Sequence, residues 1–319
     1  MAEERYLFNR RLKLVSFSLM ILGLIGLSFG FVTAPKNIQE VREIMSNHDH
    51  GEDHSNNSIK IEDKIDINSL SIKYESSKEE GEHTISHDEH VFHQLSNKPW
   101  AALYVAAFFF FMISLGTLAF YAINRAAQVG WSPILFRVME GITAYMLPGG
   151  LIVIFILFLS GLHLNHLFIW MDPEVVAHDK IIAAKKGYLN VPFVLARGLF
   201  FLAGWSLYRY FSRKFSLAQD LAKDNRYHKK NFRISAGFLV FYIVTESIMS
   251  WDWIMSIDPH WFSTLFGWYV FASMFVSGIS TIALVTIYLK AKGYLKEVND
   301  SHIHDLGKFM FGVSVFWTY

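Results

Sequence analysis

Four charged residues lie inside apolar stretches of this sequence: Glu140, Arg197, Glu246 and Asp252. A carboxylate at the centre of a bilayer costs about 3 kcal/mol on insertion scales, so such acids are mostly paired or take part in proton movement. The residue types therefore indicate proton transfer or ion pairing inside a membrane. For that chemistry to apply, the stretches that hold them must be membrane helices.

The composition is typical of a polytopic membrane protein. Hydrophobic residues make up 52% of the 319 residues and charged residues only 18%, against about a quarter in soluble domains. A net charge of +1 gives no indication of nucleic-acid binding. The absence of Cys excludes cysteine-ligated iron–sulfur clusters, covalently attached c-type haem and disulfide bonds. We also expect no b-type haem, because the histidines near the apolar stretches lie at their ends or in loops.

Apolar stretches of about 20 residues, the length needed to cross a bilayer, recur along the chain. Six complete spans are predicted, and a seventh begins near Lys308 and stops at Tyr319, too soon to cross. We therefore expect an all-α transmembrane bundle with seven spans begun, an incomplete C-terminus and three regions: 1–33, 34–99 and 100–319. The six spans are Leu12–Thr33, Trp100–Ile123, Val138–Gly161, Val191–Phe211, Ile234–Met255 and Phe262–Leu289.

Lys and Arg residues predict the orientation, because they accumulate on the cytoplasmic side of membrane proteins. They cluster before the first span, between the fourth and fifth spans, and after the sixth span, which lie on one side if the spans alternate. The N-terminus is therefore expected to be cytoplasmic. The basic residues are Arg5, Arg10, Arg11, Lys13, Arg213, Lys214, Lys223, Arg226, Lys229, Lys230, Arg233, Lys290, Lys292 and Lys296.

The segment 34–99 is polar and falls on the opposite side. It has 14 acidic residues, 7 basic residues and 7 histidines, which favours an exposed loop. Four of the histidines, at 83, 87, 90 and 93, would share one face of a helix. They could form a loose zinc or copper site, but no closed ligand set is visible, so a solvated, pH-sensitive loop is the preferred interpretation.

Position along each span predicts the depth of the charged residues. Glu246 lies near the middle of the fifth span, and Asp252 is about 9 Å nearer the outer surface. Arg197 lies six residues from the outer end of the fourth span, at a depth close to that of Asp252. An ion pair between Arg197 and Asp252 is therefore expected.

The remaining titratable groups extend this set across the membrane. His163 and His166 are predicted to share one helical face at the outer end of the third span, and Glu140 lies at its inner start. Glu140, Glu246 and the outer groups would form a proton pathway, although each acid could instead be paired for packing alone. Candidate relay groups are Tyr145, Tyr242, Thr245 and Ser250, whereas Trp251, Trp253, Trp261 and Trp268 are interpreted as interface anchors.

Three long runs resemble one known family. They are YMLPGGLIVIFILFLSGLHLNHLFIWMDPEVVAHDK (145–180), SWDWIMSIDPHWFSTLFGWYVFASMF (250–275) and GYLKEVNDSHIHDLGKFMFGVSVFWTY (293–319). The chain resembles the ActF subunits of alternative complex III, a quinol:cytochrome c oxidoreductase of bacteria, over nearly its whole length except the acidic loop. These subunits belong with the NrfD-like, or polysulfide-reductase, membrane proteins, which are helical bundles of about ten spans.

The resemblance implies a cellular location and a set of partner subunits for the chain. It implies a multi-pass subunit of the bacterial inner membrane without a redox centre of its own. The expected partners are a sister ActC-type subunit, an iron–sulfur subunit, c-type cytochrome subunits, a terminal cytochrome oxidase and membrane lipids. Quinol oxidation in such complexes is assigned mainly to the ActC-type subunit.

Three functions remain open for the chain itself. The first is a proton pathway through Glu140, Glu246, Asp252, His163, His166 and Arg197. The second is binding of a menaquinone-type quinone, for which His163, Arg197 and Asp252 are the candidate contacts. The third is a structural scaffold for the cytochrome and oxidase partners. The graded depth of the buried acids favours the proton pathway.

Overall fold

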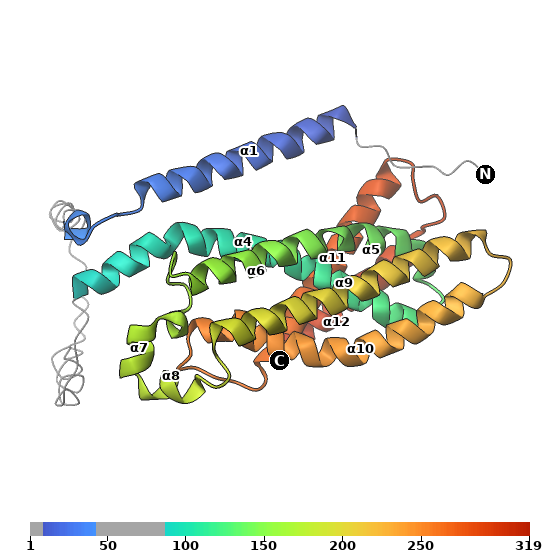
Figure 1. Ribbon diagram of the computed structural model, residues 1–319. Helices are drawn as coiled ribbons and strands as arrows, with labels where there is room; N and C mark the ends of the chain where they lie inside the picture. The colour runs from blue at the N-terminus through green and yellow to red at the C-terminus, as the bar shows by residue number, and fades with distance from the viewer. Residues whose placement is uncertain (1–8, 43–86) are drawn as a thin grey trace, which may run out of the picture. The chain divides into compact units, whose positions relative to one another are not determined.

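The computed structural model describes residues 9–42 and 87–319 (Figure 1). Every regular element in these residues is a helix. The chain divides into two compact units, Ile25–Pro99 and the remainder. His83 lies outside the described residues.

The helices, in chain order, are joined by several short 3₁₀ turns. They are α1 (Arg10–Thr33), α4 (His87–Ala126), η1 (Pro133–Leu135), α5 (Phe136–Ile142), η2 (Thr143–Tyr145), α6 (Met146–Gly161), η3 (Ile169–Met171), α7 (Pro173–His178), α8 (Lys180–Lys185), α9 (Val191–Leu221), α10 (Arg226–Trp253), η4 (Met255–Ile257), α11 (Phe266–Ala291) and α12 (Asp300–Thr318).

Within residues 9–42 and 87–319, six helical segments are long and apolar enough to cross a membrane, which suggests a multi-pass membrane protein. Each of them overlaps one of the six complete spans predicted from the sequence. The segments are Arg10–Thr33, Phe92–Ala126, Pro133–Gly161, Val191–Leu221, Arg226–Ile257 and Phe266–Ala291.

Several helices are longer than the apolar stretches within them. Helix α9 continues to Leu221 and α10 begins at Arg226, so both extend into charged sequence. Helix α4 begins at His87, so the end of the predicted polar loop is helical and Pro99 lies inside the helix. Hydropathy detects only the apolar part of a helix, whereas backbone hydrogen bonding can continue through polar residues.

Helix α12 differs from the predicted start of a seventh span. It begins at Asp300 rather than near Lys308, and it is not among the six segments above. Asn299 and His302 form a reciprocal cap: the Asn299 side chain accepts from the His302 N–H, and the His302 ring accepts from the Asn299 N–H. This polar capping box starts the helix before its apolar part.

The third span is interrupted near its middle. Between α5 and α6 the backbone forms the 3₁₀ turn η2, and Thr143 donates its hydroxyl hydrogen to the carbonyl of Glu140 at 2.9 Å. Pro148 has no N–H and so cannot bond to the carbonyl of Ala144. Both features weaken the regular hydrogen-bond ladder at this point.

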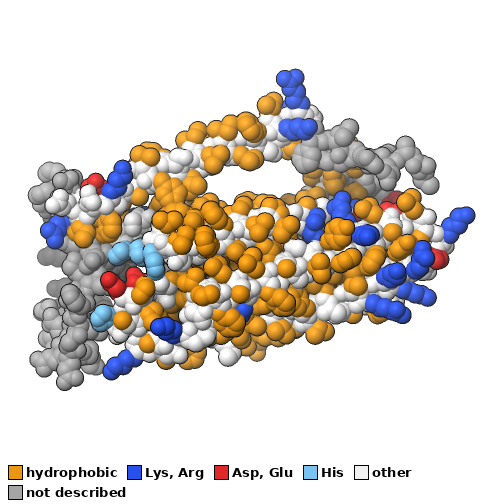
Figure 2. All heavy atoms as spheres, in the orientation of Figure 1, with side chains coloured by type: hydrophobic (Ala, Val, Ile, Leu, Met, Phe, Trp, Pro, Cys, Tyr) orange, Lys and Arg blue, Asp and Glu red, His pale blue; other side chains and the backbone are white. Residues whose placement is uncertain are grey.

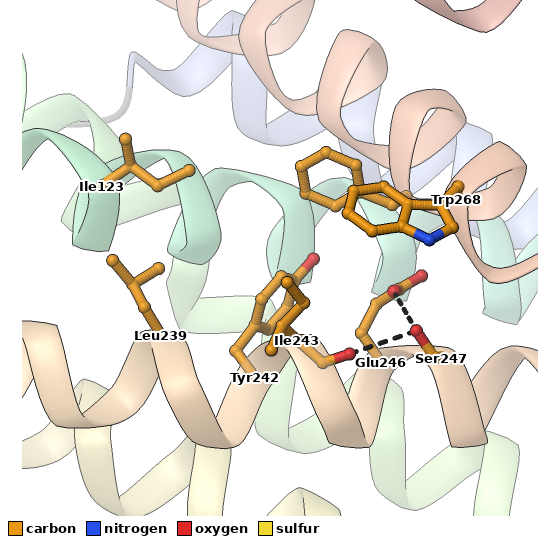
Figure 3. Close-up of a pocket in the computed structure, with 8 residues that line it drawn as sticks. Ile123, Leu239, Tyr242, Ile243, Glu246, Ser247 and Trp268 are labelled. Atoms are coloured by element: carbon orange, nitrogen blue, oxygen red, sulfur yellow. Dashed lines mark hydrogen bonds between the residues drawn. The ribbon is translucent and has the colours of Figure 1, made fainter.

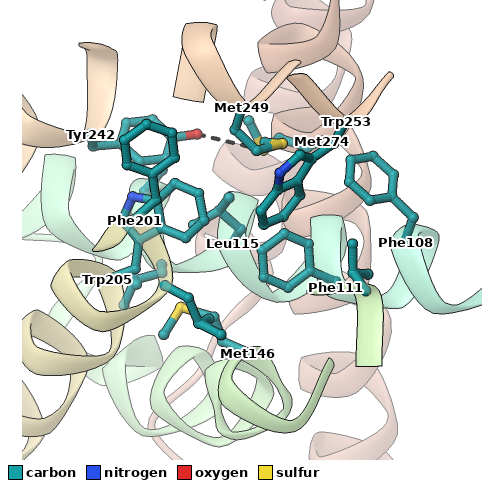
Figure 4. Close-up of a cluster of buried hydrophobic side chains, with 14 of the residues drawn as sticks. Phe108, Phe111, Leu115, Met146, Phe201, Trp205, Tyr242, Met249, Trp253 and Met274 are labelled. Carbon is teal, nitrogen blue, oxygen red and sulfur yellow. Dashed lines mark hydrogen bonds between the residues drawn. The ribbon is translucent and has the colours of Figure 1, made fainter. Parts of the chain in front are cut away.

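Aromatic side chains fill the centre of the bundle formed by residues 100–319 (Figure 4). Phe111 on α4, Trp205 on α9 and Trp253 on α10 lie against one another, with ring centroids 5.8 to 6.4 Å apart. Trp253 is fully buried, which corrects its interpretation as an interface anchor. Trp261 and Trp268, in contrast, are about half exposed, at 50% and 49%.

Two glycines bring α4 and α11 into backbone contact. A Cβ on Gly116 would overlap the carbonyl oxygen of Met274, and a Cβ on Gly278 would lie 2.7 Å from the N of Thr117. Small residues at such crossings let membrane helices approach closely. This contact fixes α11 beside α4, and α10 packs between α9 and α11.

Polar and apolar surfaces of the bundle are separated along its length (Figure 2). Hydrophobic side chains cover the middle, while Lys and Arg gather near the loop that joins α9 to α10. We call this the basic end. The opposite end, formed by α7, α8 and the α10–α11 connection, is called the Asp252 end.

Candidate functional site

A buried carboxylate stands near the basic end of the bundle. Glu140, on α5, is only 5% exposed and lies between two arginines. Arg137 donates to Glu140 Oε2 at 2.7 Å, and Arg125 Nη2 lies 4.0 Å from Oε1. Arg137 also pairs with Asp220 on α9. The two guanidinium groups offset part of the cost of burying the Glu140 carboxyl group.

Tyr121 links this acid to two other helices. Its hydroxyl donates to Glu140 Oε1 at 3.2 Å and accepts from Arg125 Nε at 3.1 Å and from Ser212 at 3.2 Å. Ser212 also lies 2.6 Å from Asn231 Oδ1. The result is a connected polar network among α4, α5, α9 and α10, called here the Glu140 network. Such networks can carry protons when their hydroxyl groups reorient.

Along α9 and α10, the polar chain continues toward the middle of the bundle. The Tyr208 hydroxyl and Ser235 Oγ share a hydrogen bond of 2.8 Å. Ser235 precedes Tyr242 by about 10 Å along the helix, and the ring of Phe238 lies between them on this face. The Tyr208 hydroxyl also interacts with Ser212 of the Glu140 network, so the described interactions extend from that network only as far as Ser235. A proton would need water or a side-chain movement to go further.

Glu246 lies beyond this gap and is 3% exposed (Figure 3). Its Oε2 accepts a long hydrogen bond of 3.5 Å from Ser247, whereas Oε1 has no partner among the described residues. The carboxyl group lines a cavity of about 140 Å³ formed by α10, α11 and Ile123 of α4. The other lining residues are Ile123, Leu239, Tyr242, Ile243, Ser247, Trp268 and Phe271.

The predicted ion pair between Arg197 and Asp252 is present. Arg197 donates from Nε to Asp252 Oδ2 at 2.8 Å and from Nη2 to Oδ1 at 2.9 Å, in the two-bond geometry that favours arginine. Asp252 is fully buried, and the guanidinium also lies 4.1 Å from the ring centroids of Tyr188 and Phe193. Arg197 Nη1 is buried and has no hydrogen-bond partner among the described residues.

Tyr188, just before α9, belongs to the same cluster. Burial of its hydroxyl raises its pKa above the ordinary value, and the nearby negative charge of Asp252 raises it further. The tyrosine therefore stays protonated and acts toward the carboxylate as a hydrogen-bond donor rather than as an acid.

The two histidines that were predicted to share a helical face do not do so. Helix α6 ends at Gly161, and His163 has a φ of 59°, a left-handed conformation that ends the helix. His163 is exposed and makes no described hydrogen bond or ion pair with Arg197 or Asp252. His166 Nδ1 lies 3.9 Å from Asp172 Oδ2. The proposed roles of both histidines remain predictions.

A second acid–histidine pair lies at the Asp252 end of the bundle. His260 Nε2 lies 2.5 Å from Asp179 Oδ2, which joins the α10–α11 connection to the start of α8. Burial of the Asp179 carboxyl opposes its ionisation, but hydrogen bonds from the Ile182 N–H, His260 and the Ile181 N–H lower its pKa overall.

The structure adds residues that the sequence did not single out. Tyr121, Arg125, Ser212 and Asn231 are all buried and bonded to one another or to Glu140. The signal that could have identified them was Asn124-Arg125 at the end of an apolar stretch, which places a cation one helix away from Glu140. Among the described residues, no group of three His, Asp or Glu side chains could hold a metal ion.

Comparison with known proteins gives no family assignment. No protein-family model matches the chain, and no curated protein matches it.

Proposed function

We propose that this chain is an integral subunit of a respiratory quinol:acceptor oxidoreductase, of the ActF or NrfD-like type, and that it contributes a transmembrane proton pathway. The observation that carries the pathway is a series of three buried carboxylates at separate heights in one bundle. They are Glu140 near the basic end, Glu246 in the middle and Asp252 near the opposite end.

The environments of the three acids suit different roles. Glu140 is paired with arginines and bonded to Tyr121, so it would collect protons from the basic end. Glu246 has an unpartnered oxygen beside a cavity and only one long hydrogen bond, so it can gain or lose a proton without breaking an ion pair. Asp252 forms an ion pair with Arg197. This pair would keep the local charge constant at the end of the bundle where protons leave the pathway.

The surrounding topology is part of the proposal. The basic end would face the cytoplasm of a bacterial inner membrane, together with the N-terminus. Helix α12 would begin a seventh span. A sister ActC-type subunit, an iron–sulfur subunit, c-type cytochromes and a terminal oxidase would pack around the bundle, and membrane lipids would cover the rest.

The test is Glu246→Gln in the assembled complex, reconstituted into liposomes with a quinol and an electron acceptor. The amide keeps the shape of the side chain but cannot exchange a proton. Protons translocated per electron should fall at least several-fold, while assembly and subunit content remain unchanged. An unchanged proton-to-electron ratio in an intact complex would contradict the pathway and favour the scaffold function.

A matched control is Gly237→Ala on the same helix. An added Cβ there meets no atom within 4 Å, so proton movement should stay at the wild-type value. If this variant also lowers the ratio, the loss in Glu246→Gln reflects disturbance of α10 rather than removal of a carboxyl group.

One observation favours quinone binding as a second candidate function. Arg197 Nη1 is a buried donor without a described partner, and a quinone carbonyl would accept its hydrogen bond. Photo-labelling with an azido-menaquinone analogue should then mark the peptides around Arg197 and Tyr188. Arg197→Lys should abolish that label, and labelling confined to other subunits would exclude the site.

A further inference from the structure

The cavity beside Glu246 opens toward the outer surface of α10 and α11. Two of its lining residues, Ile243 and Trp268, are about half exposed, at 51% and 49%. The Glu246 carboxyl is directed toward the Trp268 ring across the cavity (Figure 3). In a membrane this surface would face lipid or another helix, because its lining is mainly apolar.

The size of the cavity limits its occupant. Ligand pockets usually measure about 300 to 1,000 Å³, whereas a cavity of roughly 150 Å³ accepts a group no larger than benzene. The 140 Å³ beside Glu246 therefore accommodates one small group, such as the end of a side chain.

The charge and shape of the lining indicate which side chain. Glu246 Oε1 is a buried acceptor without a described partner, and a cation or a strong donor would compensate it. The rings of Trp268, Phe271 and Tyr242 surround the space, and aromatic faces attract cations. Only one carboxylate oxygen is vacant, which suits the compact ammonium of lysine better than the planar guanidinium of arginine.

Helices α10 and α11 lie close together beside the cavity. Gly267 is buried, and a Cβ on it would lie 3.0 Å from Ser247 Oγ. The two helices that carry most of the lining are therefore in close contact at this point.

We propose that the α10–α11 surface at Glu246 is the docking site of a membrane-spanning helix from another polypeptide, whose lysine side chain enters the cavity and pairs with Glu246. This inference goes beyond the proposed function and does not rest on it. An ammonium–carboxylate pair can still exchange a proton, so both proposals can hold together.

The test uses native membranes and a lipid-soluble carbodiimide as the probe. The reagent converts a carboxyl group into an O-acylisourea, and a neighbouring primary amine displaces the urea to form an amide bond. An adjacent lysine should therefore become covalently joined to Glu246, and sequencing of the linked peptides identifies both residues. Without a nearby amine, the product rearranges to an N-acylurea on Glu246 alone.

The proposal predicts an amide between Glu246 and a lysine in an apolar segment of another polypeptide. It is overturned if Glu246 carries only the N-acylurea or stays unmodified. It is likewise overturned if the linked lysine belongs to this chain or to a second copy of it. Because the wild-type protein answers the question, the outcome does not depend on a variant that folds.

A photo-crosslinking side chain provides an independent measurement. Placed at Ile243, on the rim of the cavity, it should link to the same partner peptide as the carbodiimide. Placed at Phe155, which is 58% exposed on α6 and does not line the cavity, it should not. Equal capture of that peptide from both positions would overturn docking at the cavity.

Discussion

Arg197 and Asp252 form two parallel hydrogen bonds, of 2.8 and 2.9 Å, across the contact between α9 and α10. The carboxylate is fully buried, so each residue compensates the charge of the other in a region that water does not reach. This pair joins the ends of two neighbouring spans. Removal of one partner should therefore lower the free energy of unfolding.

Asp252→Asn should destabilise the protein by about 3 to 5 kcal/mol, because it leaves the Arg197 guanidinium buried and uncompensated. Thermal unfolding in detergent micelles, followed by circular dichroism, measures the loss. The matched control replaces both residues by Leu, which removes both charges and should cost less. A double variant as unstable as Asp252→Asn would contradict this account of the pair.

Tyr121→Phe should cost more stability than Tyr208→Phe. The Tyr121 hydroxyl bonds to Glu140, Arg125 and Ser212, whereas that of Tyr208 bonds to Ser235. Leaving buried polar partners unsatisfied costs about 1 to 3 kcal/mol for each group. Unfolding of the two variants under identical conditions gives the comparison. Equal losses would mean that the Glu140 network does not act as a connected unit.

Gly278→Ala should separate α4 from α11 and lower stability. Its Cβ would lie 2.7 Å from the N of Thr117, a backbone atom that cannot move without shifting the whole helix. Overpacking of this kind costs about 1 to 3 kcal/mol. Gly237→Ala, which meets open space, serves as the control and should be neutral or slightly stabilising. Equal stability of the two variants would show that the helix contact is looser than described.

The Asp179–His260 contact should make stability depend on acid pH. The pKa of Asp179 is lower in the folded protein than its ordinary value near 3.9. Its stabilising contribution is therefore complete above that value and is lost as the pH falls through the lower folded pKa. Melting temperatures measured between about pH 6 and pH 3 should fall more steeply for the wild type than for Asp179→Asn.

The control for this prediction is Asp172→Asn. Asp172 caps α7 as Asp179 caps α8, but its carboxyl lies 3.9 Å from His166 and makes no comparably short bond to a histidine. Asn preserves the capping hydrogen bond, so this variant should keep the acid dependence of the wild type. Parallel pH profiles for the wild type and Asp179→Asn would show that the His260 contact does not contribute.

The spans and one ion pair could be predicted because they follow from local pattern and depth. Apolar length located all six spans, and counting residues from the helix ends placed Arg197 level with Asp252. The helix ends were less predictable. The break after Gly161 depends on the left-handed conformation of His163, which no periodicity reveals.

The Glu140 network could not be predicted in full, because its members come from four helices. Which face of α4 meets α5 is decided by packing, including the close contacts at Gly116 and Gly278. A single sequence gives the depth of Tyr121 and Asn231 but not their rotation toward each other. The cavity at Glu246 likewise arises from the spacing of α10 and α11 rather than from any motif.

The most direct measurement of the central claim is infrared difference spectroscopy of the assembled complex during quinol oxidation. If Glu246 gains and loses a proton, the C=O stretching band of a protonated carboxyl should change with turnover, shift in heavy water and disappear in Glu246→Gln. The same band changes in the wild type and in Glu246→Gln would contradict the claim that this carboxyl carries protons.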